Sequence, residues 1–146
     1  MRSPMRPLAE KLLATLGTEG PIFAYSGFEK RVISDLAEIF PDLDGPLMQL
    51  TQRIVDLLPI ARAHYYHPAM KGSWSIKAVL PTIAPELAYE NLGEVQEGGG
   101  AQAAFLEAVD VSTSAERRRE LSEALHQYCN RDTLAMVQLV HHFLAS

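Results

Sequence analysis

Two short apolar runs, at residues 22–25 and 54–58, constrain the fold of this chain more than any other feature. The first follows a Gly20-Pro21 break and is rich in strand-forming residues, and the second is closed by Pro59. Each run predicts a buried strand, because it is too short for a helix. The residues between them have helical periodicity, which predicts a right-handed parallel crossover. We therefore expect an α/β fold, mostly helical, with two short parallel strands packed by helices.

Apolar spacing and breaking residues predict the helices. We expect them at residues 7–16, 27–40, 46–53, 76–80 and about 101–109, followed by a C-terminal helical region with a capping box at Thr113-Ser114-Ala115-Glu116. The side chains of 27–40 that we expect to face inward are Phe28, Val32, Leu36, Ile39 and Phe40. Pro81 and Pro85 are expected to break the chain after residue 80, and the triple glycine at 98–100 is interpreted as a flexible joint.

Length and charge limit the classes of function. The 146 residues fit a single domain, 1–146, and a net charge of -5 excludes a broad basic surface for duplex DNA. The single cysteine, Cys129, cannot form an intramolecular disulfide, which favours a reducing compartment. No apolar run approaches the roughly 20 residues that cross a bilayer, and the segment Met1-Arg2-Ser3-Pro4 lacks the apolar core of a signal peptide. We expect a cytoplasmic protein without a membrane partner.

Asp132 occupies an unusual position in the C-terminal helical pattern. Apolar residues recur there at three- and four-residue steps, and Tyr128 and Asp132 fall on the same stripe. Burying a carboxylate is unfavourable unless a cation or several donors meet it, so the position requires a partner. The alternative is that the helix face turns back to solvent at Asp132, with Arg131 or Thr133 nearby.

The segment Ser26-Gly27-Phe28-Glu29 has two interpretations. As a capping box, Ser26 and Glu29 would satisfy free amides where the first strand turns into a helix. As a functional segment, it would place the Glu29 carboxylate just past the C-terminal end of a parallel strand, where open α/β sheets hold their ligands.

Residues 62–77 form a region of aromatic and basic side chains. Tyr65, Tyr66 and Trp74, with Arg62, Lys71 and Lys77, could stack bases and contact phosphates of a single strand, or the aromatic rings could simply pin a loop to the core. A zinc site is the further alternative that histidines at positions 64, 67, 141 and 142 allow, although no cysteine accompanies them.

The order of these motifs resembles the second and third motifs of DEDD-type 3′–5′ exonucleases, which have an RNase H-like fold. It is more closely similar to an uncharacterised bacterial family, a domain of unknown function that is predicted to share this fold. The resemblance covers about residues 20–140. Its motifs are Ala24-Tyr25-Ser26-Gly27-Phe28-Glu29, Asp56-Leu57-Leu58-Pro59, His64-Tyr65-Tyr66-His67-Pro68, Lys71-Gly72-Ser73-Trp74-Ser75-Ile76-Lys77, Val79-Leu80-Pro81 and Tyr128-Cys129-Asn130-Arg131-Asp132-Thr133.

The resemblance implies a metal-dependent catalytic site. Glu29 and Asp132 would be the second- and third-motif acids that hold Mg²⁺ or Mn²⁺, and Tyr128 would orient the attacking water. The implied partner is a nucleic acid, single-stranded in form, and the residues expected to contact it are Ser26, Tyr65, Tyr66, Lys71, Trp74 and Lys77. The exonuclease pattern usually has Asn at position 26 and Asp at position 29, so the ligand at Glu29 is one methylene longer.

The first motif of those exonucleases, an Asp-x-Glu pair on the opening strand, does not occur in this chain. We therefore expect the C-terminal portion of the fold without its opening strands, from a fragment or a shortened relative, and no nuclease activity from the chain alone. A non-catalytic helical module for interaction or nucleic-acid binding is the alternative. An unpaired edge of the strand at 22–25 would be covered either by the helix of residues 7–16 or by a second copy of the chain, and of the two we expect the symmetric homodimer.

Overall fold

The structure is a computed structural model that describes residues 5–145. The chain divides into two compact units, Met1–Tyr65 and Tyr66–Ser146, and each is described by itself. The prediction of a single domain stays a prediction. Among the described residues, no helix combines the length and the hydropathy that crossing a bilayer requires.

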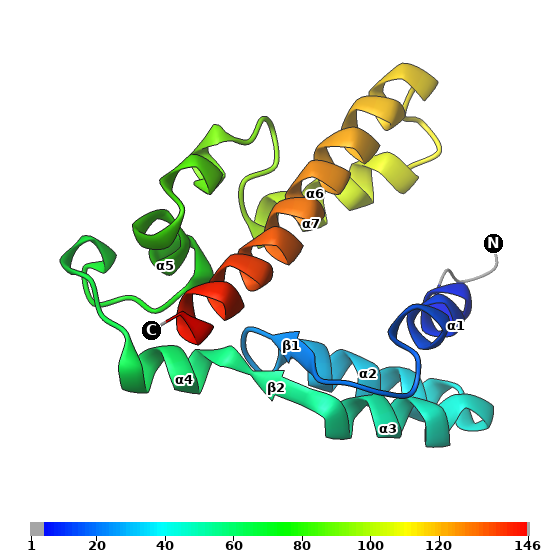
Figure 1. Cartoon of the computed structure of the whole chain (residues 1–146). Helices are drawn as coiled ribbons and strands as arrows, with labels where there is room; N and C mark the ends of the chain where they lie inside the picture. The colour runs from blue at the N-terminus through cyan, green and yellow to red at the C-terminus, as the bar shows by residue number, and fades with distance from the viewer. Residues whose placement is uncertain (1–4, 146) are drawn as a thin grey trace. The chain divides into compact units, whose positions relative to one another are not determined.

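The first unit is built around one parallel strand pair (Figure 1). Its elements are α1 (Met5–Leu16), β1 (Ile22–Ala24), α2 (Phe28–Ile39), a 3-10 turn (Pro41–Leu43), α3 (Asp44–Arg53), β2 (Ile54–Asp56) and α4 (Leu57–His64). β1 pairs with β2 so that Ile22 faces Ile54 and Ala24 faces Asp56. The expected α/β class, mostly helical with two short parallel strands, is confirmed. The homodimer through the β1 edge stays a prediction.

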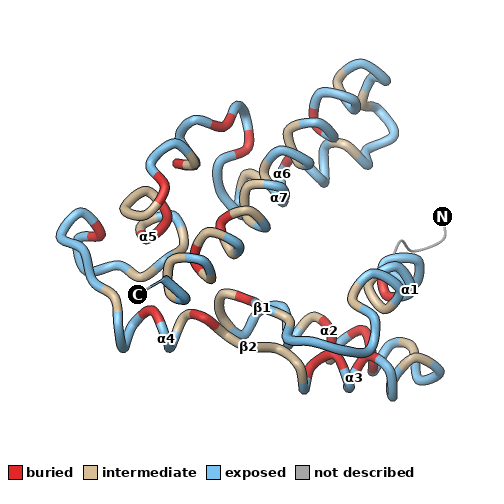
Figure 2. The backbone as a smooth tube through the Cα atoms, viewed as in Figure 1, coloured by how far each residue is buried: buried red, intermediate tan, exposed pale blue. Residues whose placement is uncertain are grey.

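Helices α1, α2 and α3 enclose the core of the first unit, seen as the red segments of these helices in Figure 2. Its buried side chains are Ala9, Ile33, Leu36, Ala37, Leu47 and Leu50. The prediction that Phe28 and Ile39 face inward is wrong, since both are exposed. The buried face of α2 is centred on Ile33, Leu36 and Ala37, and both side chains lie away from that centre.

Arg53, the last residue of α3, fixes the connection from α1 to β1. Its guanidinium donates hydrogen bonds to the carbonyl oxygens of Leu16, Gly17, Glu19 and Gly20. Gly17 ends α1 with a φ of 55°, a left-handed conformation that glycine adopts without a Cβ clash. One side chain therefore satisfies carbonyls at a helix end and in the loop that follows it.

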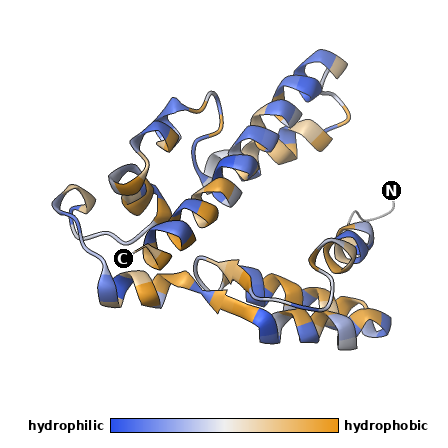
Figure 3. Cartoon of the chain, viewed as in Figure 1, coloured by the Kyte–Doolittle hydropathy of each residue, from blue (hydrophilic) through white to orange (hydrophobic). Residues whose placement is uncertain are grey.

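Two expectations about the strands are wrong. β1 is not buried along its whole length, because Phe23 is exposed. β2 ends at Asp56, and Leu57 begins α4 instead of extending the strand. Asp56 caps α4 by accepting a hydrogen bond from the Leu58 amide, and Pro59 lies in the first turn, where a missing N–H is tolerated. Figure 3 shows how apolar the strands and the start of α4 are, which is why the two are hard to separate by hydropathy.

Helices and 3-10 turns are the regular elements of the second unit, and no strand occurs among its described residues. Its elements are 3-10 turns at Pro68–Met70, Pro85–Leu87 and Tyr89–Asn91, and the helices α5 (Ile76–Ile83), α6 (Gly98–Val109) and α7 (Ala115–Leu144). One core cluster contains Leu80, Ala84, Tyr89, Leu92 and Ala135, and another contains Val95, Ala104 and Leu121. Helices α6 and α7 pack side by side (Figure 1).

Glycine and proline act differently here from what we expected. The triple glycine is the first turn of α6 and not a joint, with the Ala101 amide bonded to the Glu97 carbonyl. Pro81 lies inside α5, which continues to Ile83. Burial of Val79 and Leu80 holds this helix together, since packing contributes more than propensity to most helices. Ser114 caps α7 through the Arg117 amide, as expected.

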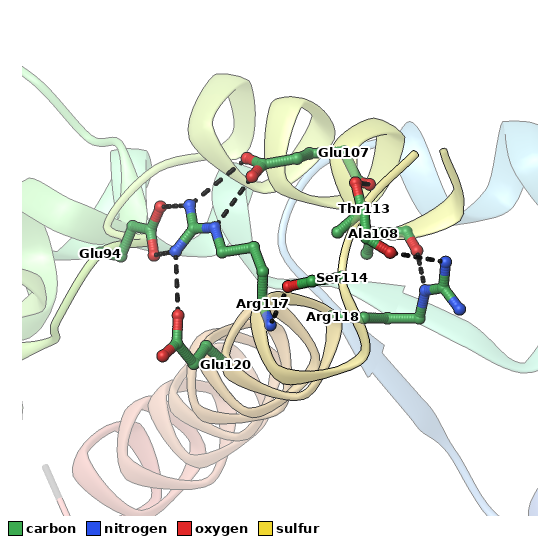
Figure 4. A network of polar contacts seen from close by, with 8 residues as sticks. All are labelled: Glu94, Glu107, Ala108, Thr113, Ser114, Arg117, Arg118 and Glu120. Carbon is green, nitrogen blue, oxygen red and sulfur yellow. Dashed lines mark hydrogen bonds and ion pairs between the residues drawn. The ribbon is translucent and has the colours of Figure 1, made fainter. Parts of the chain in front are cut away.

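An ion-pair network around Arg117 links the start of α7 to α6 and to the segment before it (Figure 4). The guanidinium bonds Glu94, Glu107 and, at 3.4 Å, Glu120. Its neighbour Arg118 donates to the carbonyl oxygens of Ala108, Asp110 and Thr113, which closes the α6–α7 turn. The network is exposed, so we assign it to the geometry of this turn and not to a buried site.

Candidate functional site

The C-terminal ends of β1 and β2 gather around the Asp56 carboxylate. Its Oδ1 accepts hydrogen bonds from the amides of Ser26, at 2.8 Å, and Leu58, at 2.9 Å. Ser26 has a φ of 102°, a backbone conformation that is strained for a residue with a Cβ and that clusters at functional sites. The expected capping box is found only in part. Gly27 is the N-cap residue of α2 and makes no side-chain cap, but the Ser26 hydroxyl accepts a hydrogen bond from the Phe28 amide at 3.4 Å. The strained Ser26 backbone also directs its own amide toward Asp56.

Glu29 and Tyr25 lie at the same end of the first unit. Glu29 is exposed in the first turn of α2, where the positive end of the helix dipole favours a carboxylate. Burial raises the pKa of the Tyr25 hydroxyl to about 12, with a further rise from the Asp56 charge and an opposing effect from Arg62. Several polar side chains therefore lie near the C-terminal ends of the strands, where we expected Glu29 from the sequence.

Asp132 lies on the same stripe of α7 as the buried Leu121, Ala135 and Leu139 and is half-buried, which agrees with the first of its two interpretations. Its Oδ1 accepts a hydrogen bond from the Tyr89 hydroxyl. Burial raises the pKa of the Asp132 carboxyl, although the Tyr89 hydrogen bond and the Lys77 charge both act to lower it. Arg131 and Thr133 bond instead to the carbonyls of Ala88 and Cys129. The partner that Asp132 requires is therefore Tyr89.

Tyr128 lies one helical turn before Asp132 and is also half-buried. Its ring contacts the ring of Tyr89 edge to face, with the centroids 6.1 Å apart. Burial, followed by the Asp132 charge, raises the pKa of its hydroxyl. The structure therefore gathers Tyr89, Tyr128 and Asp132, a group in which two members were identified from the sequence.

A small cavity of about 250 Å³ adjoins this group and is lined by Lys77, Tyr89, Glu90, Gln96 and Glu97. The Lys77 ammonium lies 5.8 Å from the centroid of the Tyr89 ring, a cation–π arrangement. The Lys77 ammonium thus lies over the Tyr89 ring, and its charge reaches Asp132. From the sequence we expected this residue to contact nucleic acid.

Metal ligands do not gather within the described residues. No group of three or more His, Cys, Asp or Glu side chains in residues 5–145 could hold a metal ion. The four histidines considered for a zinc site therefore do not form such a group within these residues. Mg²⁺ and Mn²⁺ take about six ligands, mostly oxygens, so Glu29 and Asp132 alone do not fit a complete site. Glu29 belongs to the first unit and Asp132 to the second, and their convergence stays a prediction.

The remaining residues expected to contact nucleic acid are dispersed. Ser26 lies at the strand ends, and Tyr65 is the C-cap residue of α4. Tyr66 and Trp74 make a ring contact with centroids 5.8 Å apart, and Lys71 lies in the turn between them. Of the predicted set, the structure therefore brings together Tyr66, Lys71 and Trp74 in one loop.

We expect Asp132→Asn to be more stable than the wild-type chain at pH 7. The raised pKa means that the folded protein keeps a proton on Asp132 at pH values where the unfolded chain has lost it. The charge therefore lowers stability above the folded-state pKa, and this loss disappears once the pH falls below the ordinary carboxyl pKa. Asparagine still accepts from Tyr89, so urea unfolding should show a difference at pH 7 that closes as the pH falls.

The matched control for this prediction is Glu123→Gln, an exposed carboxylate on the same helix. It should leave the free energy of unfolding nearly unchanged at both ends of the pH range. An Asp132→Asn variant less stable than wild type at pH 7 would show that the carboxylate stabilises the fold, and would contradict the prediction.

Comparison with known proteins gives a family and no function. The model of the family described as "Domain of unknown function (DUF2779)" matches residues 1–75, just over half of the chain. Neither the curated proteins nor the solved structures contain a match to the chain. The family match includes Ser26, Glu29 and Asp56 and ends before Tyr128 and Asp132. The chain belongs to this family of proteins with a domain of unknown function.

Proposed function

We propose that this chain is part of a metal-dependent 3′–5′ exonuclease-like domain of the RNase H-like class, which processes nucleic acid. In this proposal, Glu29 and Asp132 are acids of its second and third motifs, and Tyr128 is the residue that orients water. The Asp-x-Glu motif is missing from the sequence, and the described residues do not make a complete metal site. The chain alone should therefore not hydrolyse nucleic acid, and further acids must come from elsewhere.

The observation that supports this proposal most is the setting of Asp132. A half-buried carboxylate whose pKa is raised by burial lowers the stability of the folded protein at neutral pH. Groups of this kind are concentrated at functional sites, where activity and not stability explains the residue. Tyr128 lies one turn away on the same helix face, in the order that the exonuclease resemblance requires.

A manganese titration tests the proposal. We expect Mn²⁺ to bind weakly and to broaden the carboxyl NMR signals of both Glu29 and Asp132, because each acid would supply one part of the incomplete site. Asp132→Asn should remove the broadening at Glu29 as well, whereas Glu123→Gln should change nothing. Broadening that is no stronger at Glu29 and Asp132 than at Glu123 would overturn the proposal.

A further inference from the structure

The acidic residues of this chain are unevenly distributed. The sequence contains 18 Asp and Glu residues, yet none lies between Asp56 and Glu86. The same segment carries Arg62, Lys71 and Lys77, together with two histidines. A chain with a net charge of -5 therefore contains a long segment whose own charged side chains are all positive.

Within the second unit, this segment exposes an aromatic ring. Tyr66 is 58 % exposed, whereas Met70, four residues later, is 2 % exposed and anchors the loop in the core. The half-buried Trp74 contacts the Tyr66 ring at a tilt of 47°. Because Met70 already anchors the loop, packing does not explain the exposed Tyr66 ring, which is supported by Trp74 and open to solvent.

The loop that carries Tyr66 has a defined backbone. The His67 Nδ1 accepts from the Ala69 amide, the Lys71 amide donates to the Pro68 carbonyl, and the Ser73 amide donates to the Met70 carbonyl. Lys71 has a φ of 52°, in the left-handed region that non-glycine residues rarely adopt outside functional or turn positions. The turn therefore fixes the backbone of Lys71, which lies between the two aromatic residues in the sequence, and little backbone entropy would be lost on binding.

We propose that this loop binds single-stranded nucleic acid, with one unpaired base stacked on Tyr66 and a neighbouring phosphate bound by Lys71. An aromatic face and a nearby cation are the combination that single-strand binding uses. A duplex offers no free base face for stacking, and the net negative charge of the protein opposes broad contact with its backbone. This inference rests on the proposed function in one respect, since it specifies the form of nucleic acid that the domain would process. The contacts of the loop themselves require neither Glu29 nor Asp132.

Fluorescence anisotropy with a 5′-labelled oligo(dT) or oligo(rU) strand, in EDTA and at low salt, tests the inference. Tyr66→Ala should weaken binding by about 5- to 150-fold, the range expected for loss of one stacked base, and Tyr66→Phe should bind like wild type. Lys71→Ala should weaken binding and lower the salt dependence by roughly one phosphate contact. Phe105→Ala, at an exposed aromatic on α6, is the matched control and should have no effect.

The outcomes separate this inference from the proposed function. Wild-type protein that binds neither strand, Tyr66→Ala that binds like wild type, or a labelled duplex that binds as tightly as the single strand would each overturn the inference. Binding to oligo(dT) or to oligo(rU) supports the inference, and the strand that binds more tightly identifies the preferred sugar. Because binding is measured in EDTA, it does not depend on a metal ion. A failed manganese titration would thus refute the exonuclease-like proposal and leave this site standing.

Discussion

Asp56→Ala is expected to lower the free energy of unfolding of the first unit by about 2–3 kcal/mol. The variant loses the acceptor of two backbone amides, those of Ser26 and Leu58, at the point where both strands end. The Ser26 amide would be left without this partner in a strained backbone, and α4 would lose its cap. Urea unfolding, followed through the amide NMR signals of β1, measures the effect.

Asp56→Asn is the matched variant, because its side-chain carbonyl still accepts from both amides without the charge. It should lose only about half as much stability as Asp56→Ala, since hydrogen bonds to a charged acceptor are roughly twice as strong as neutral ones. Equal stability of wild type and Asp56→Ala would show that these amides find other partners. The comparison also distinguishes a structural carboxylate, Asp56, from Glu29, whose loss should not unfold β1.

The parallel strand pair could be predicted because its signals are local. Strand-forming runs, breaking residues and the helical spacing between them lie within short stretches of sequence, and a helical connection requires a crossover. The positions of the strand ends could not be predicted in the same way. Leu57 and Leu58 extend the apolar run of β2, but the Asp56 side chain caps a helix and directs them into α4.

The errors at glycine and proline have a related cause. Gly98, Gly99 and Gly100 disfavour a helix interior, yet in a first turn they form a helix whose later residues pack on α7. Pro81 is tolerated inside α5 because the residues before it, Val79 and Leu80, are fully buried. In both places, tertiary packing outweighs local propensity, and the sequence alone does not show that packing.

The candidate site was predicted only in part for the same reason. Asp132 and Tyr128 share a helix stripe, so their proximity follows from helical geometry. Tyr89 is 43 residues from Asp132 in sequence and lies in a 3-10 turn that has no periodic pattern. The one available signal was the requirement that a half-buried carboxylate have a donor, which predicts that a partner exists without naming it.

We propose that Glu29 and Asp132 belong to one site, and a nitroxide on Cys129 tests this proposal most directly. Cys129 is the single cysteine of the sequence, is exposed, and lies one helical turn before Asp132. If the two carboxylates lie within roughly 8 Å, as acids sharing a pair of metal ions would, the amide signals of Glu29 and the first turn of α2 should disappear.

Reduction of the nitroxide to its diamagnetic form should restore those signals, which is the control for any change caused by the label itself. Labelled Cys129→Ser protein should show no broadening, because it has no thiol to carry the probe. We predict complete loss of the Glu29 amide signal in the oxidised sample. A Glu29 signal of equal intensity in the oxidised and reduced samples would place the two acids in separate sites and contradict it.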